Sequence, residues 1–351
     1  VYCCGQIDYF SIFSFQEVFR LLGVRNLAGN AEHCLNAGAV HNEMLTGQEG
    51  PFLTLEQALE GPRRTFLLSG WNGLISHPPA FHRLVKRPDL NAWLVEVAVT
   101  ETAQALAAKL GPDRVLLVKP GTDPHVALAA MHEVLRKHPQ AVDRRFVERF
   151  GDAATLDAYC ALAGRAEYAP ERVAARCAPE EKYVARLQAG IRGIAAAFAR
   201  EDAVPINLPS VGLSQTKGAV SHCLWGNLLA ALGKYGIRPG GQPAGGTLRI
   251  PGQINAETEV QGLSRNRFMG RLCVDTDAGE AARRMGLPAG AYDAVSASPP
   301  IAALDYSAPR PERCTCCVPA TPTGRGARPT SPGPCSTRRC AAITGPRPPP
   351  G

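Results

Sequence analysis

The sequence predicts an α/β protein in which parallel sheets, built from βαβ units, are flanked by helices. Short apolar runs at residues 65–68, 92–97 and 115–118 are typical of strands that are buried on both faces. Each run is followed by a turn signal and a helical stretch, and in residues 126–137 the apolar side chains recur at intervals of three and four. Strands that alternate with helices of this length indicate a parallel sheet.

The remaining predicted elements are two helices after the first and second strands, an alanine-rich helical insertion without obvious chemistry, a fourth strand, an apolar helix and a glycine-rich stretch. They lie, in that order, at residues 81–86, 101–110, 143–200, 204–208, 219–232 and 240–252. The strand–loop–helix unit therefore occurs in an early and in a late part of the chain.

The length of 351 residues gives room for about two domains of ~150 residues each. We expect residues 1–60 and 205–275 to form a first α/β lobe, and residues 61–204 to form a second lobe that contains the helical insertion. Residues 276–308 are expected to be a linker. Residues 309–351, which are rich in Pro, Arg and Cys, are expected to be a disordered tail, because so few aliphatic residues cannot offset the entropy of ordering.

The net charge of +7 does not indicate a nucleic-acid-binding protein. From Pro309 onward the chain carries seven arginines and one acid, Glu312, so the tail accounts for +6 of this charge and the rest is close to neutral. No apolar run reaches the ~18 residues of a membrane span, and no secretory signal is visible. We therefore expect no nucleic-acid partner and no membrane span.

The twelve cysteines form neither a disulfide framework nor a zinc site. Five lie in the tail, where four residues separate Cys335 from Cys340, but Cys314, Cys316 and Cys317 are too close together to form the second pair of ligands that a zinc site needs. The other seven are scattered along the chain, which suits a reducing compartment.

Loops with unusual residues follow the predicted strands, where parallel α/β sheets bind their ligands. The loop after the first strand contains Gly70 and Asn72, the loop after the third contains Gly121 and Asp123, and Gly212 follows the fourth. These glycines permit the backbone to approach a phosphate closely, although each segment could equally be a turn that binds no ligand. The carboxylate of Asp123 could accept two hydrogen bonds from a guanine edge, cap the helix that follows, or do both.

Cys34 has two readings that the residues alone leave open. A single cysteine is usually a small buried hydrophobic residue, but its thiolate is also a soft ligand for a transition metal. The neighbouring His33 is either a histidine of the surface or core, or a residue that supports such a ligand.

Seven segments, in this order along the chain, resemble the dimethyl sulfoxide reductase superfamily of molybdenum enzymes. They are Gly5-Gln6, Asn30 to Val40 around Cys34, Gly70-Trp71-Asn72 to Ser76-His77-Pro78, Thr100-Glu101-Thr102-Ala103, Pro120-Gly121-Thr122-Asp123, Gly212 with Gln215 and Gly218, and Gly252-Gln253 with Asn255-Ala256. The resemblance covers about residues 1–275 and is greatest to the cysteine-ligated nitrate reductases.

The resemblance implies a molybdenum bis(molybdopterin guanine dinucleotide) cofactor bound by both lobes. Cys34 would be the protein ligand of the metal and the catalytic residue. The residues that would bind the dinucleotides are Gly70, Asn72, His77, Glu96, Thr100, Gly121, Asp123, Gly212, Gln215, Gly252, Gln253 and Asn255. The metal would be molybdenum or tungsten, and the protein would orient and tune the cofactor.

The chain departs from the family pattern at three places. Glu96-Val97-Ala98-Val99 stands where the family usually has Asp-Pro-Arg-Arg, so an arginine contact is lost, whereas Glu96 can still bond a ribose hydroxyl. The N-terminal domain with its iron–sulfur cluster is missing, and the tail stands in place of the domain that closes over the cofactor. We therefore expect a fragment of a larger enzyme, with its iron–sulfur cluster in the missing domain.

Oxygen-atom transfer such as nitrate reduction is the expected reaction, with a small inorganic or one-carbon substrate and an electron-transfer protein or subunit as partners. Oxidation of formate is an alternative, which Leu35 disfavours because formate dehydrogenases usually have His at that position. A non-catalytic, cofactor-free remnant is a third reading, and a cysteine hydrolase is a fourth. We expect a cytoplasmic protein, with export to the periplasm left open because respiratory relatives are exported folded.

Overall fold

The computed structural model describes residues 2–21, 28–29, 53–210, 218–238, 241–253 and 255–256. The chain divides into two units, Val1–Asn36 with Gln253–Gly351 and Ala37–Gly252. In the described part of the first unit, the short strands β1 (Tyr2–Cys3) and β2 (Ala28–Gly29) pair in parallel, and α1 spans Tyr9–Leu21. The predicted linker and tail lie outside the described residues.

The second unit contains a six-stranded sheet with the order β5-β4-β3-β6-β8-β7. Only β7 is antiparallel to its neighbour. The strands, in sheet order, are β5 (Val115–Leu117), β4 (Ala92–Glu96), β3 (Arg64–Ser69), β6 (Val204–Pro209), β8 (Pro243–Thr247) and β7 (Gly236–Ile237). The predicted mixed α/β class with a mostly parallel sheet is therefore confirmed.

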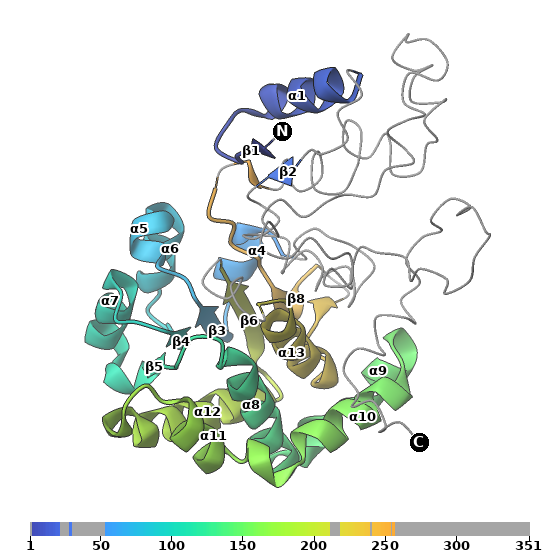
Figure 1. Cartoon of the computed structure of the whole chain (residues 1–351). Coiled ribbons are helices and arrows are strands. Elements are labelled where there is room, and N and C mark those ends of the chain that lie inside the picture. The colour runs from blue at the N-terminus through green and yellow to red at the C-terminus, as the bar shows by residue number, and fades with distance from the viewer. Residues whose placement is uncertain are drawn as a thin grey trace, which may run out of the picture. The chain divides into compact units, whose positions relative to one another are not determined.

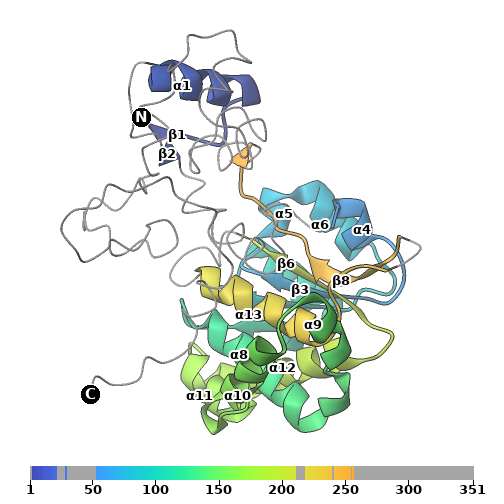
Figure 2. The same cartoon turned by 90° about the vertical axis from the view of Figure 1, so that its right-hand side faces the viewer.

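Helices cover both faces of this sheet (Figures 1 and 2). One face packs against α5, α6 and α7, and its core includes Phe66, Trp71 and Phe81. The opposite face packs against α8, α12 and α13, and its core includes Leu67 and Trp225. The helices of the second unit are α4 (Leu55–Leu59), α5 (Gly73–Ser76), α6 (Pro78–Val85), α7 (Glu101–Leu110), α8 (Asp123–Lys137), α9 (Arg144–Phe150), α10 (Ala153–Ala163), α11 (Pro170–Cys177), α12 (Val184–Ala199) and α13 (Gly218–Ala231).

The strand order reverses between β3 and β6. From β3 the chain continues outward through β4 to β5, and it then returns to add β6 and β8 on the other side of β3. The helix after β3 packs on one face and the helix after β6 on the other. In open α/β sheets, ligands bind at the carboxyl ends of the strands beside such a topological switch point.

The expected lobe boundary between residues 204 and 205 falls inside β6. This strand pairs with β3 along its whole length, from Arg64 opposite Val204 to Ser69 opposite Pro209. Residues on both sides of the expected boundary therefore contribute to one sheet. Helices α10, α11 and α12 of the predicted insertion contribute buried side chains to one core, so this segment is a structural layer.

Strand β8 was not predicted, because its sequence Pro-Ala-Gly-Gly-Thr contains a single β-branched residue, Thr247, and no aromatic residue. Its glycines have a steric reason. A Cβ atom at Gly245, where φ is +147°, would lie 2.5 Å from the carbonyl oxygen of Lys234 and 2.8 Å from that of Pro205. Only glycine lets these backbones approach so closely.

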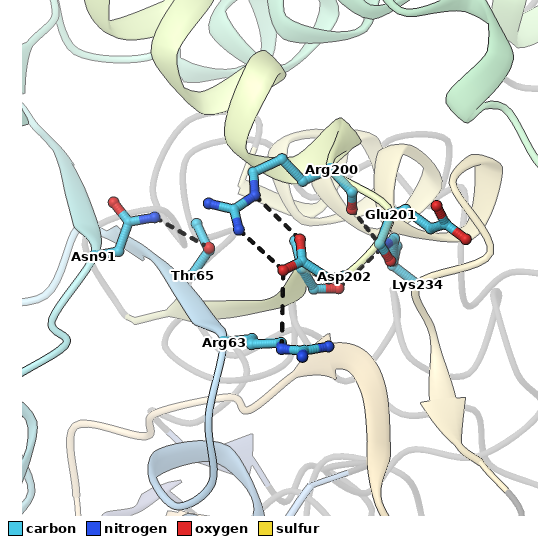
Figure 3. A network of polar contacts seen from close by, with 8 residues as sticks. Arg63, Thr65, Asn91, Arg200, Glu201, Asp202 and Lys234 are labelled. Carbon is cyan, nitrogen blue, oxygen red and sulfur yellow. Dashed lines mark hydrogen bonds and ion pairs between the residues drawn. The ribbon is translucent and has the colours of Figure 1, made fainter.

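Lys234 fixes the connection between α12 and β6 (Figure 3). Its buried Nζ donates hydrogen bonds to the carbonyl oxygens of Arg200, Glu201 and Ala203 at 2.8, 2.8 and 2.9 Å. These carbonyls follow the end of α12, where the helix dipole favours a cation. Burial lowers the pKa of Lys234 because it removes the ammonium group from water, and the nearby charge of Arg238 lowers it further.

The packing of α12 against β5 leads to a prediction about two glycines of this helix. A Cβ at Gly190 would overlap the side chain of Leu116, whereas one at Gly193 would lie 3.2 Å from the ring of Trp93. We expect Gly190→Ala to lower the free energy of unfolding by about 1–2 kcal/mol, because overpacking outweighs the better helix propensity of alanine.

Gly193→Ala is the matched control, in which a small shift of the indole suffices, and its effect should stay within about 0.5 kcal/mol. Urea denaturation of both variants measures the difference. Equal stability of the two variants would contradict the packing described for α12.

Candidate functional site

The loops after β3 and β5 turn sharply at the carboxyl edge of the sheet. Gly70 follows β3 with φ +59°, and its N–H donates to the carbonyl oxygen of Val95 at 3.0 Å. Gly121 has φ +75° in the loop after β5, where the hydroxyl of Thr122 donates to the carbonyl oxygen of Lys119 at 2.6 Å. Both glycines adopt left-handed conformations, so these turns need the residues that the sequence has.

Asn72 joins the loop after β3 to the beginning of α7. Its Oδ1 accepts from the N–H of Thr102 at 3.2 Å, and its Nδ2 donates to Glu101 Oε2 at 2.8 Å. In return, Thr102 Oγ1 accepts from the N–H of Leu74 at 2.8 Å. The side chain of Thr100 caps α7 by accepting from the N–H of Ala103 at 3.2 Å. Asn72 and Thr100 thus hold two neighbouring loops in place.

His77 joins the loop after β3 to the loop after β8. Trp71 is buried, and its Nε1–H donates to His77 Nδ1 at 3.1 Å. Because an indole nitrogen can only donate, Nδ1 is the acceptor, and Nε2–H donates to the carbonyl oxygen of Pro251 at 2.8 Å. A Cβ at Gly73 would lie 2.5 Å from the indole, so glycine is needed where this ring packs.

Two buried carboxylates occupy the same edge of the sheet. Glu96 is the last residue of β4 and Asp123 the first residue of α8, with 7% and 6% of their surfaces exposed. Burial raises the pKa of both groups, and the neighbouring Asp123 raises the pKa of Glu96 further. In the described part of the chain neither forms an ion pair, and the one hydrogen bond to the Glu96 carboxylate comes from the N–H of Val97 at 2.9 Å.

The Gly252–Ala256 segment brings together two motifs from distant parts of the sequence. In the first unit, the N–H of Asn255 donates to the carbonyl oxygen of Gly5 at 2.8 Å, and Asn255 Nδ2 donates to that of Ile7 at 2.6 Å. Gln253 Nε2 contacts the sulfur of Cys4 at 3.4 Å. Gly252 is exposed.

Three of the predicted site residues, Cys34, Gly212 and Gln215, lie outside the described residues. In the described ranges, no three His, Cys, Asp or Glu side chains gather as metal ligands would. None of the helices there has the length and apolar character to cross a membrane. Comparisons with protein-family models and with curated protein sequences found no match to this chain.

The structure also gives contacts to polar residues that were not among the predicted site residues. Trp71 and Thr102 complete the two loop contacts, and Asn207 places a buried amide in the middle of β6. A signal for Asn207 was present, since it interrupts the otherwise apolar run Val-Pro-Ile-Asn-Leu-Pro. Thr102 belongs to one of the segments that carry the resemblance, but no signal in the sequence indicated its contact with Leu74, which is 28 residues away.

The buried carboxylates predict an unusual dependence of stability on pH. The ordinary pKa values are 3.8 for Asp123 and 4.5 for Glu96, and both are raised in the folded protein. Between the ordinary and the raised values the folded state binds more protons than the unfolded state. The contribution of these groups is therefore most favourable at low pH and is lost as the pH rises through the raised values.

We expect Asp123→Asn and Glu96→Gln to stabilise the ligand-free protein at neutral pH, because each amide avoids burying a charge. Their stability relative to the wild type should increase from about pH 4 to about pH 8 in thermal denaturation. Asp113→Asn changes an exposed aspartate and should show no such trend. A flat difference for all three variants would contradict the assigned burial.

Proposed function

We propose that this chain is part of a molybdopterin guanine dinucleotide oxidoreductase of the dimethyl sulfoxide reductase superfamily, and that the carboxyl edge of β3, β4 and β5 binds one guanosine of the cofactor. The observation that carries the proposal is the buried pair of Glu96 and Asp123. Two carboxylates without a cation in the described part of the chain attract a ligand that donates hydrogen bonds.

The chemistry of guanosine fits this edge. Guanine presents adjacent N–H donors, which one carboxylate can accept in a bidentate arrangement, and ribose presents hydroxyls. Asp123, at the beginning of α8, would accept from the base, and Glu96, at the end of β4, from the ribose. The loops with Gly70 and Gly121 come from neighbouring strands, and their turns would let the backbone approach the pyrophosphate.

The protein's contribution is to orient the cofactor and exclude water from it. When bound, the metal centre would supply the redox chemistry of an oxygen-atom transfer such as nitrate reduction, with formate oxidation as the alternative. Asn72, Thr100 and His77 would keep the binding loops in position through the contacts described above. Cys34 would provide the thiolate ligand.

A cofactor-free structural protein is the second candidate, and a specific observation favours it. The side chains of Asn72 and His77 are satisfied within the protein, so both have a structural role that needs no ligand. The buried acid pair separates the two candidates, because a protein without a ligand at this edge gains nothing from burying two like charges.

The guanosine site predicts selective binding of guanine nucleotides. We expect GDP to bind the purified chain in isothermal titration and ADP to bind at least about tenfold more weakly, because adenine lacks the second donor that Asp123 would accept from. Asp123→Asn should weaken GDP binding by about tenfold to a hundredfold. Asp113→Asn is the matched control and should bind as the wild type does, whereas equal affinity for GDP and ADP would leave the structural candidate.

The metal ligand is tested separately. When the protein is produced in a molybdenum-replete host, we expect elemental analysis to find molybdenum, and acid treatment to release about two guanines per chain. Cys34→Ala should lose catalytic activity and retain the pterin, because the two dinucleotides bind through other residues. Absence of both metal and guanine from the wild type would refute the proposed enzyme class.

A further inference from the structure

His77 connects two segments of the second unit through both nitrogens of its ring. Its Nδ1 accepts from the buried indole Nε1–H of Trp71 at 3.1 Å, and its Nε2–H donates to the carbonyl oxygen of Pro251 at 2.8 Å. Trp71 lies in the loop after β3, whereas Pro251 lies in the segment after β8. The three residues therefore join these two segments, and we call them the histidine clasp.

The surrounding structure leaves the two rings of the clasp little freedom to move. The N–H of His77 donates to the carbonyl oxygen of Gly73 at 2.9 Å, and the carbonyl oxygen of His77 accepts from the N–H of Phe81 at 3.0 Å. Two prolines with fixed φ follow directly. The indole of Trp71 lies against Gly73, and it meets the ring of Phe81 edge-on with 6.1 Å between the centroids.

A second proton on the His77 ring affects its neighbours unequally. Ser76 Oγ lies 2.7 Å from Nδ1 and 3.0 Å from the carbonyl oxygen of Asn72, so its hydroxyl can turn, donate to Asn72 and accept from a protonated Nδ1. The bond to Pro251 needs no change, because Nε2 keeps its hydrogen. The indole of Trp71 can only donate, so its buried N–H loses its acceptor when Nδ1 gains a proton.

The hydrogen-bond partners of the ring carry no charge. Within the described residues they are the indole of Trp71, the hydroxyl of Ser76 and the carbonyl oxygen of Pro251. No bonded carboxylate would therefore neutralise a protonated ring. Other titratable and charged groups on the elements around the clasp include Glu101 on α7, His82 and Arg83 on α6, Glu56 and Glu60 at α4, Arg249 on the segment after β8, and the acid pair of Glu96 and Asp123.

The clasp holds the chain close to the point where it leaves the second unit. The segment after β8 is fixed at its beginning by the sheet, since the N–H of Ile250 donates to the carbonyl oxygen of Pro209 at 2.9 Å. The next residue is Pro251, and the second unit ends at Gly252. His77 therefore anchors the end of this segment.

We propose that the histidine clasp is a pH-sensitive switch, which is closed while His77 Nδ1 is unprotonated and is opened by a second proton on the ring. Opening separates the ring from the indole of Trp71, and the movement of the ring releases Pro251. The loop after β3 also carries Gly70 and Asn72, so acidification loosens one of the loops at the carboxyl edge. The switch does not depend on the proposed guanosine site, because its contacts lie within the protein.

Nuclear magnetic resonance of the full chain tests the switch as the pH is lowered from about 8 to about 5. The chain has three tryptophans, and the Trp71 indole signal is assigned by its loss in Trp71→Phe. We expect this indole proton to shift upfield, as its hydrogen bond breaks, over the pH interval in which the His77 ring gains its proton. The amide nitrogen of Gly252, which is bonded to the Pro251 carbonyl carbon, should shift over the same interval.

Three variants connect the response to the clasp. His77→Asn retains a side-chain acceptor but cannot take up a proton, so the pH response of Trp71 should be lost. His82→Asn removes an exposed histidine of α6 and should leave the response unchanged. In Trp71→Phe, which serves in case His77→Asn fails to fold, a second proton breaks no indole bond. The His77 ring should then gain its proton at a higher pH than in the wild type.

The indole of Trp93, which lies beneath the guanidinium of Arg114, is the internal control and should not follow the titration of His77. A Trp71 signal that stays in place while the His77 ring gains its proton would overturn the proposal. So would an equal shift in His77→Asn, which would assign the response to another group such as the acid pair. A ring that stays unprotonated down to about pH 5, or that gains its proton at the same pH in Trp71→Phe, would contradict it too.

Discussion

The parallel pairing of β3 with β6 is the contact on which the arrangement of this protein depends. It joins residues 64–69 to residues 204–209, about 140 positions apart in the chain, and it sets the point where the strand order reverses. A pairing between segments so far apart in the chain has an entropic cost of loop closure, which the packing on both faces of the strand helps to offset. The insertion between the two strands provides part of that packing, because α10, α11 and α12 bury their apolar faces in one core. Lys234 then fixes the backbone just before β6.

The sequence predicted local structure well and long-range pairing poorly, for a physical reason. Four strands and the major helices were visible because apolar runs and intervals of three and four are local signals. The local sequence could not show whether a lobe boundary lies at residue 204, because nothing in Val204–Pro209 indicates that its neighbouring strands are β3 and β8. Strand β8 was missed because it is defined by close backbone approach at Gly245 and not by propensity. Likewise, Gly70, Asn72 and Asp123 were expected near one edge, but the contact of Asn72 with Thr102 needed the structure.

The candidate site contains two kinds of polar residue with different energetics. Asn72, Thr100 and His77 have their hydrogen-bonding groups satisfied by the protein, so they stabilise the loops that carry them. Glu96 and Asp123 are in the opposite situation, because burial opposes the ionisation of both and the charge of Asp123 further opposes that of Glu96. The loops therefore form a frame around two buried acids for which the described part of the chain provides no cation, which is compatible with the proposed ligand site.

This contrast bears on whether the chain is an enzyme component or a structural relative. Replacing buried like charges by neutral or apolar residues is neutral or stabilising when no ligand uses them, so a purely structural protein has no physical need for the pair. A site that accepts hydrogen bonds from guanosine does need the carboxylate pair. The bound ligand would then offset the free-energy cost of burying the two charges. The buried acid pair at the carboxyl edge of the sheet is therefore better explained by the proposed ligand site than by the requirements of the fold.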